Sequence, residues 1–298
     1  MKPLRTLPVS SQSGAALLIL IVIIVIISMT VLLKALNYKG SKTRQNAAAI
    51  SALAKAKEAL IAYAVTYVDN VSGNANPGRL MCPDTVPTGT CGIGRLPLRP
   101  LSLSDQDFVS NQEFWYALND GFRENQPVVN SSTTGSTTGL LKLDGVDKVV
   151  AIIIAPGLPL TGQNRPSNNA ADYLEAGNVG GTDFVTTATG EFNDKVMAVR
   201  RSEIMSIVTG WLSGEIKKHL NTYHNINHFY PADPASFIGA LTIDPLPDWV
   251  TDNNWLSVTN YMPISGDKAS LKFDGCDIVY TYTFTNGETK IDRNPPHC

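Results

Sequence analysis

Three histidines, His219, His224 and His228, fall within one stretch of ten residues and are the first candidates for chemistry. Imidazole nitrogens bind transition metals, and His224 and His228 have the four-residue spacing that places two ligands on one helix face. The stretch contains no H-E-x-x-H pattern and has no cysteine nearby. Asn225 and Asn227 indicate that a helix ends here. We therefore predict a solvated helix end and no metal site.

Three aspartates near the end of the chain, Asp267, Asp274 and Asp277, are candidate calcium ligands, because calcium prefers carboxylate oxygens. They lack the D-x-[DN]-x-[DN]-G spacing of a calcium loop, so we expect turn residues and keep calcium only as an alternative. The chain also has no G-x-S-x-G elbow, Walker loop or dinucleotide fingerprint. The sequence therefore predicts no catalytic residues and no other cofactor.

The chain has four cysteines, Cys82, Cys91, Cys276 and Cys298. They form no C-x-x-C motif, and their spacing does not suit zinc. An even number favours disulfides formed in an oxidising compartment. Three pairings are open, and we favour Cys82–Cys91 with Cys276–Cys298 because each closes a short loop. Four free buried thiols are the alternative.

The charges of the 298 residues are divided unevenly along the chain. Residues 1–57 contain eight basic residues and no acidic one. All 26 acidic residues and the other 16 basic residues follow, so the two parts carry +8 and −10. The basic part borders an apolar stretch and the remainder is acidic, which argues against a nucleic-acid binder. A hydrophobic content of 43% argues against disorder.

Residues 15–33 read AALLILIVIIVIISMTVLL, with no charge and only Ser28 and Thr30 as polar side chains. About 20 apolar residues span a bilayer as a helix, so this run predicts a transmembrane helix. Lys34 follows it where a signal peptide would have small residues for cleavage. Apolar residues then recur at three- and four-residue steps, which predicts a continuous helix over 15–68 whose second half packs on a globular domain.

The start of the chain, MKPLRTLPVSSQSG followed by AALLI, resembles a type IV prepilin or the related pseudopilin of a type II secretion system. The resemblance implies a leader over 1–14, cut after Gly14 by a prepilin peptidase, and methylation of Ala15. Most members have Glu at the fifth mature position, where this chain has Ile19. The difference indicates a tip or minor subunit that needs no partner above it, or an anchor that never enters a filament.

For residues 69–298 the patterns predict an α+β head. A buried strand is expected over 146–156, a second strand over 192–201, an amphipathic helix over 202–224 and a hairpin over 271–288. A helix, a tyrosine, a polar loop and a proline recur in that order, so we expect two pilin-like subdomains divided near residue 200. The predicted fold is a long transmembrane pilin-like helix packed on a periplasmic head with antiparallel sheets.

The resemblance implies a minor pilin or pseudopilin, a structural and assembly subunit with no catalytic activity. Its partners would be other pilin subunits through the N-terminal helix, the prepilin peptidase and the bacterial inner membrane, with no nucleic acid. The head would lie in the periplasm, or at the cell surface within a pilus. One alternative is an adhesin or substrate-recognition head at a filament tip, and another is a membrane-anchored periplasmic protein outside any filament.

Overall fold

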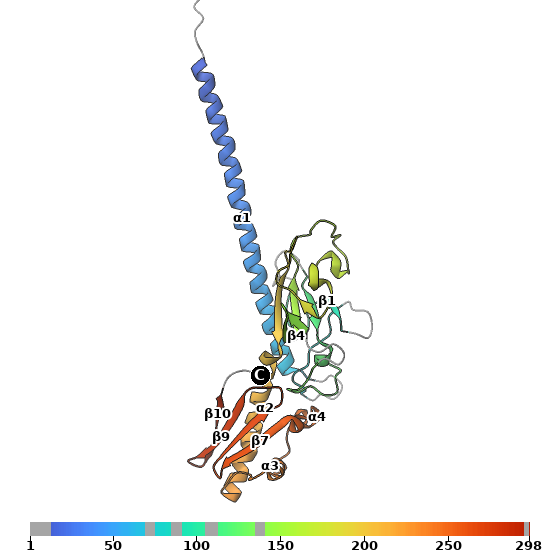
Figure 1. The fold of residues 1–298 in the computed structure, drawn as a ribbon, viewed down its shortest axis with the longest axis vertical. Coiled ribbons are helices and arrows are strands. Elements are labelled where there is room, and N and C mark those ends of the chain that lie inside the picture. Colours follow the sequence, from blue (N-terminus) through green and yellow to red (C-terminus); the bar gives the residue numbers. More distant parts are fainter. Residues whose placement is uncertain (1–12, 69–74, 85–90, 105–112, 135–140, 295–297) are drawn as a thin grey trace, which may run out of the picture. The chain divides into compact units, whose positions relative to one another are not determined.

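The computed structural model describes residues 13–68, 75–84, 91–104, 113–134, 141–294 and 298, and within the first range it leaves out the side chains of 13–19 and 31–42. Residues 1–48 and 49–298 form two compact units, which we describe separately (Figure 1). Residues 1–12 of the predicted leader lie outside the described residues.

Helix α1 (Ser13–Thr66) is rich in alanine and leucine, with β-branched residues concentrated near its start. From Leu53 onward it contributes to the core of the second unit. Leu53, Ala56, Leu60 and Ala64 recur at three- and four-residue steps and are almost completely buried. This part of α1 is therefore a structural helix of the head.

The predicted transmembrane helix over 15–33 is not supported by the structure. No helix in the described part of the chain is long and apolar enough to cross a membrane. The prediction of a single-pass membrane anchor is corrected accordingly.

The first sheet packs against the buried face of α1. Its centre is the strand formed by residues 146–155, and residues 149–155 of that strand are buried, which confirms the predicted apolar strand. All pairs are antiparallel except β3 with β5. The order is β1-β2-β4-β3-β5, with β6 on the other side of β4. The strands are β1 (Ile93–Arg95), β2 (Trp115–Leu118), β3 (Leu141–Leu143), β4 (Val146–Ala155), β5 (Asp183–Phe184) and β6 (Lys195–Arg200).

The second sheet is an antiparallel meander that packs on α2 (Arg201–Asn227), the predicted amphipathic helix (Figure 1). Thr209 Oγ1 and Tyr280 Oη share a hydrogen bond of 2.9 Å between helix and sheet, and Ser213 Oγ and Tyr282 Oη share one of 2.8 Å. The strands are β7 (Thr259–Ser265), β8 (Lys268–Phe273), β9 (Val279–Thr285) and β10 (Glu288–Asn294), and short helices α3 (Pro234–Leu241) and α4 (Asp248–Asp252) precede them.

Two buried contacts join the parts of the head that carry the two sheets. The side chain of Asn253 is fully buried, accepts a hydrogen bond from Val129 N and donates one to Asn76 Oδ1, both 3.0 Å long. Arg201 Nη2 donates to the carbonyl oxygen of Gly275 at 2.7 Å. Residues 49–298 are thus one α+β unit with two sheets, and the subdivision near residue 200 stays a prediction.

Candidate functional site

The longest run of exposed apolar side chains in the described chain lies on the first part of α1. Every side chain over residues 20–27 is large and apolar, and each is 48–57% exposed. Met29 is 61% exposed. Ser28 Oγ donates to Ile24 O and Thr30 Oγ1 to Ile27 O, each at 2.8 Å, so both hydroxyls bond within the helix. The segment therefore offers a partner an almost purely apolar helix surface, which is typical of an association site.

The predicted processing residues lie at the beginning of the same helix. The backbone of Gly14, Ala15 and Ile19 is helical, and the side chains of Ala15 and Ile19 are outside the described part of the chain. Cleavage after Gly14, methylation of Ala15 and the assembly role of position 19 therefore stay predictions.

The cysteines form two disulfides, Cys82–Cys91 and Cys276–Cys298, which is the pairing favoured by loop length. The second bond ties the last residue to the turn after β8. Cys298 N also donates to Ser206 Oγ of α2 at 3.3 Å. The bond therefore attaches the end of the described chain to both the second sheet and its helix.

Of the candidate metal ligands, only His224 and Asp267 are seen in contact in the described part of the chain, and they form a pair. His224 is buried, its Nε2 lies 2.7 Å from Asp267 Oδ1, and its ring stacks on Phe284 with centroids 3.6 Å apart. His228 is the left-handed residue that ends α2, and Asp274 Oδ1 accepts from Asn260 Nδ2 at 2.7 Å. The described residues contain no group of three His, Cys, Asp or Glu side chains that could hold a metal ion.

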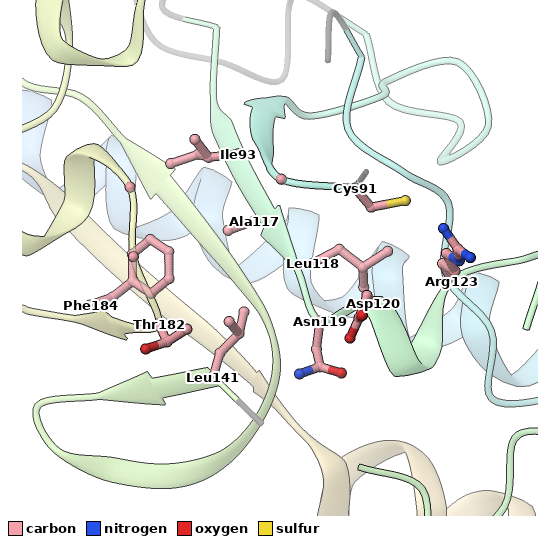
Figure 2. Close-up of a pocket in the computed structure, with 13 residues that line it drawn as sticks. Cys91, Ile93, Ala117, Leu118, Asn119, Asp120, Arg123, Leu141, Thr182 and Phe184 are labelled. Atoms are coloured by element: carbon pink, nitrogen blue, oxygen red, sulfur yellow. The ribbon is translucent and has the colours of Figure 1, made fainter. Parts of the chain in front are cut away.

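A cavity of about 500 Å³ opens on the first sheet (Figure 2). Leu141 and Phe184 contribute apolar surface, whereas Asp120 and Arg123 lie at one end (Figure 2). Its cysteine, Cys91, is held in a disulfide and so supplies no nucleophile. Segments 85–90 and 135–140, which adjoin Cys91 and Leu141 in the chain, lie outside the described residues, and we assign the cavity no ligand.

Sequence reasoning missed a stack of charged and aromatic side chains beside the first sheet. The guanidinium carbon of Arg95 lies 4.1 Å from the ring centroid of Trp115 and 4.2 Å from that of Tyr173. On Tyr173, the guanidinium carbon of Arg165 is 4.6 Å from the ring centroid. These residues are up to 78 positions apart with no common spacing, so no sequence signal connects them.

Comparison of the whole chain with family models, with curated proteins and with solved structures finds no match.

Proposed function

We propose that the chain is a structural subunit of a type IV pilus or type II secretion filament, of the minor kind, that assembles through the first part of α1. The observation that carries the proposal is the exposed apolar surface over residues 20–29, on the helix that also enters the core of the head. Ser13-Gly14 and the apolar run after it, the residues of the prepilin resemblance, support the same role.

Burial of the exposed apolar side chains gives the size of the driving force. Complete burial of one such side chain is worth about 1.5–3 kcal/mol, and about half of that remains to be gained in this segment. Nine side chains would therefore contribute about 7–13 kcal/mol. Association costs about 4–15 kcal/mol in lost freedom. We therefore expect stable assembly only where several neighbouring helices cover the segment together.

The disulfides support maturation outside the reducing cytoplasm, since such bonds form and persist in oxidising compartments. We propose the periplasm as that compartment. The proposal requires only that α1 exchanges contact with its surroundings for contact with neighbouring subunits.

Two substitutions of exposed apolar residues test the proposal. Ile24→Asp places a charge within the segment, whereas Leu158→Asp does so at an exposed loop position of the head, with original exposures of 53% and 64%. In cells that naturally produce the chain, Ile24→Asp should remove it from sheared filaments and Leu158→Asp should not. Whole-cell immunoblots check that both variants accumulate. Recovery of the Ile24→Asp chain in filaments at the wild-type level would refute the proposal.

A separate measurement tests processing. The N-terminal sequence of chain recovered from those cells should begin at Ala15 and carry a methyl group. An intact Met1 in filament-associated chain would contradict the prepilin interpretation.

A further inference from the structure

Residues 156–194, which connect β4 to β6, cover the face of the first sheet that points away from α1. We call them the cover segment. Leu174 and Phe184 of this segment pack with Trp115, Ile152 and Ile154 of the sheet in a second apolar cluster. The cover segment contains only two short 3₁₀ turns and the two-residue strand β5. Side-chain hydrogen bonds must therefore contribute much of the stability of the cover segment on the sheet.

A series of partly and fully buried polar contacts connects the middle of the cover segment to its last residue, Asp194. Arg165 Nη2 donates to Gln163 Oε1 at 2.8 Å, and Gln163 Nε2 donates to Glu175 Oε1 at 3.0 Å. Glu175 and Asp194 then bind reciprocally. The backbone N–H of each donates to the carboxylate of the other at 3.1 Å. Asn178 Nδ2 donates to Asp194 Oδ2 at 3.0 Å. The reciprocal bonds bring the two carboxylates together.

One carboxylate oxygen of the pair lacks a hydrogen-bond donor in the described part of the chain. Glu175 is 8% exposed and Asp194 only 1%, and Asp194 Oδ1 is buried with no hydrogen-bond partner in the described part of the chain. A proton on Oδ1 would give that atom a donor role and remove the repulsion between two buried carboxylates. Burial, and to a smaller extent the neighbouring Glu175, raise the pKa of Asp194 to about 7, although hydrogen bonds from Asn178 and the Glu175 backbone oppose the change.

The surrounding cations do not supply the missing charge. Arg165 lies within electrostatic reach of both carboxylates, but its own hydrogen bonds go to neutral oxygens, among them Gly157 O at 2.6 Å. Lys195 Nζ donates to the backbone oxygens of residues 193 and 194. Arg95 is paired with Glu113 at 3.1 Å. With one guanidinium shared between two carboxylates, one proton completes the charge balance.

We infer that residues 156–194 are a proton-dependent cover over the apolar face formed by Trp115, Ile152 and Ile154, closed by a proton held between Glu175 and Asp194. Below neutral pH the closed cover keeps this proton, whereas an open cover, with Asp194 in water, loses it near the ordinary aspartate pKa. Closure therefore weakens as the pH rises from about 4 to about 7 and changes little above that. The open form exposes the apolar sheet face to solvent. The inference does not depend on the filament role.

Hydrogen exchange on the full chain tests the cover directly. The amides of Glu175 and Val185 are bonded to Asp194 Oδ2 and Asn178 Oδ1, and so report on closure. After correction for the intrinsic exchange rate, their protection factors should fall about 10- to 100-fold between about pH 5 and about pH 8.5. The amides of residues 152 and 153 in β4 provide the internal reference and should change far less. Equal changes at both sets of amides would overturn the inference.

Three variants separate the proton from other causes. Asp194→Asn supplies a permanent N–H donor toward Glu175 and should abolish the pH dependence, leaving the cover closed at both pH values. Glu175→Gln removes the repulsion between the two carboxylates, so the pH dependence should become weaker without disappearing, because burial still raises the pKa of Asp194. Glu191→Gln changes an exposed carboxylate of the same segment and should behave as wild type. Wild-type pH dependence in Asp194→Asn would overturn the inference.

Discussion

The contact between Gly275 and Ser131 gives the sharpest prediction about how the head is held together. Gly275 has a φ of +76°, and a Cβ built on it would lie 2.4 Å from the carbonyl oxygen of Ser131 and 3.2 Å from the carbonyl carbon. The obstacle is backbone, so it cannot rotate away as a flexible side chain would. Arg201 fixes the same turn by donating to Gly275 O at 2.7 Å. Gly275→Ala should therefore be strongly destabilising.

The size of the effect has two parts. Placing a residue other than glycine at positive φ costs about 1–2 kcal/mol. Forcing an extra methyl group into a filled site costs about 1–3 kcal/mol more. The expected loss for Gly275→Ala is therefore about 2–5 kcal/mol.

Gly287→Ala is the matched control. Gly287 lies in the turn between β9 and β10, has a φ of +83° and has nothing within 4 Å of an added Cβ. This variant should lose only the conformational part, about 1–2 kcal/mol. The difference between the two variants, about 1–3 kcal/mol, measures the contact with Ser131 alone.

Urea unfolding of the full chain in mild detergent, followed by circular dichroism, measures both free energies of unfolding. In thermal scans, each kcal/mol should shift Tm by about 2–4 °C for a unit of this size. If the two variants lose the same stability, the close approach of Ser131 to Gly275 does not hold the head together, and the reasoning is wrong.

Three further changes test other parts of the head. Asn253→Ala leaves Val129 N without its acceptor in a buried site and should cost about 1–3 kcal/mol in urea unfolding. An unchanged unfolding midpoint would refute the bridging role. Replacing both Cys276 and Cys298 by serine opens a loop with a sequence separation of 22 and should lower the free energy of unfolding by about 2–4 kcal/mol. Non-reducing peptide mapping checks the disulfide pairing in wild type. Asp194→Asn should be as stable as wild type near pH 4 and more stable than wild type at about pH 8, by up to about 4 kcal/mol. The reason is that the pKa of Asp194 is raised in the folded protein, so wild type loses stability as the pH rises between these values. Parallel pH–stability curves for the two proteins would contradict this.

Regular parts of the head could be predicted because each leaves a local pattern. The apolar run over 146–156 predicts β4, and the helical spacing over 202–224 predicts α2. The Asn-Gly pair at 286–287 marks the turn between β9 and β10, where both residues have positive φ. In these elements the hydrophobic period and the turn chemistry favour the same structure.

The remaining features depend on contacts that no local pattern records. The sequence of residues 156–194 shows no helical or strand periodicity of apolar residues. The segment is held in place by side-chain hydrogen bonds, such as those between Glu175 and Asp194, which are nineteen positions apart. The histidine spacing indicated a shared helix face but not the stacking of His224 on Phe284. The transmembrane prediction was based on hydropathy over 15–33 alone, and no helix in the described part of the chain is long and apolar enough to cross a membrane.

The junction at Arg200 has a mechanical consequence. Strand β6 ends at Arg200 and α2 begins at Arg201, with no linker between them. A force applied along β6 from the second sheet therefore reaches β4 through six paired residues at once, which loads their hydrogen bonds in shear. Shear requires many bonds to fail together, whereas peeling breaks them one at a time. The head should consequently resist extension along this strand more strongly than its equilibrium stability suggests.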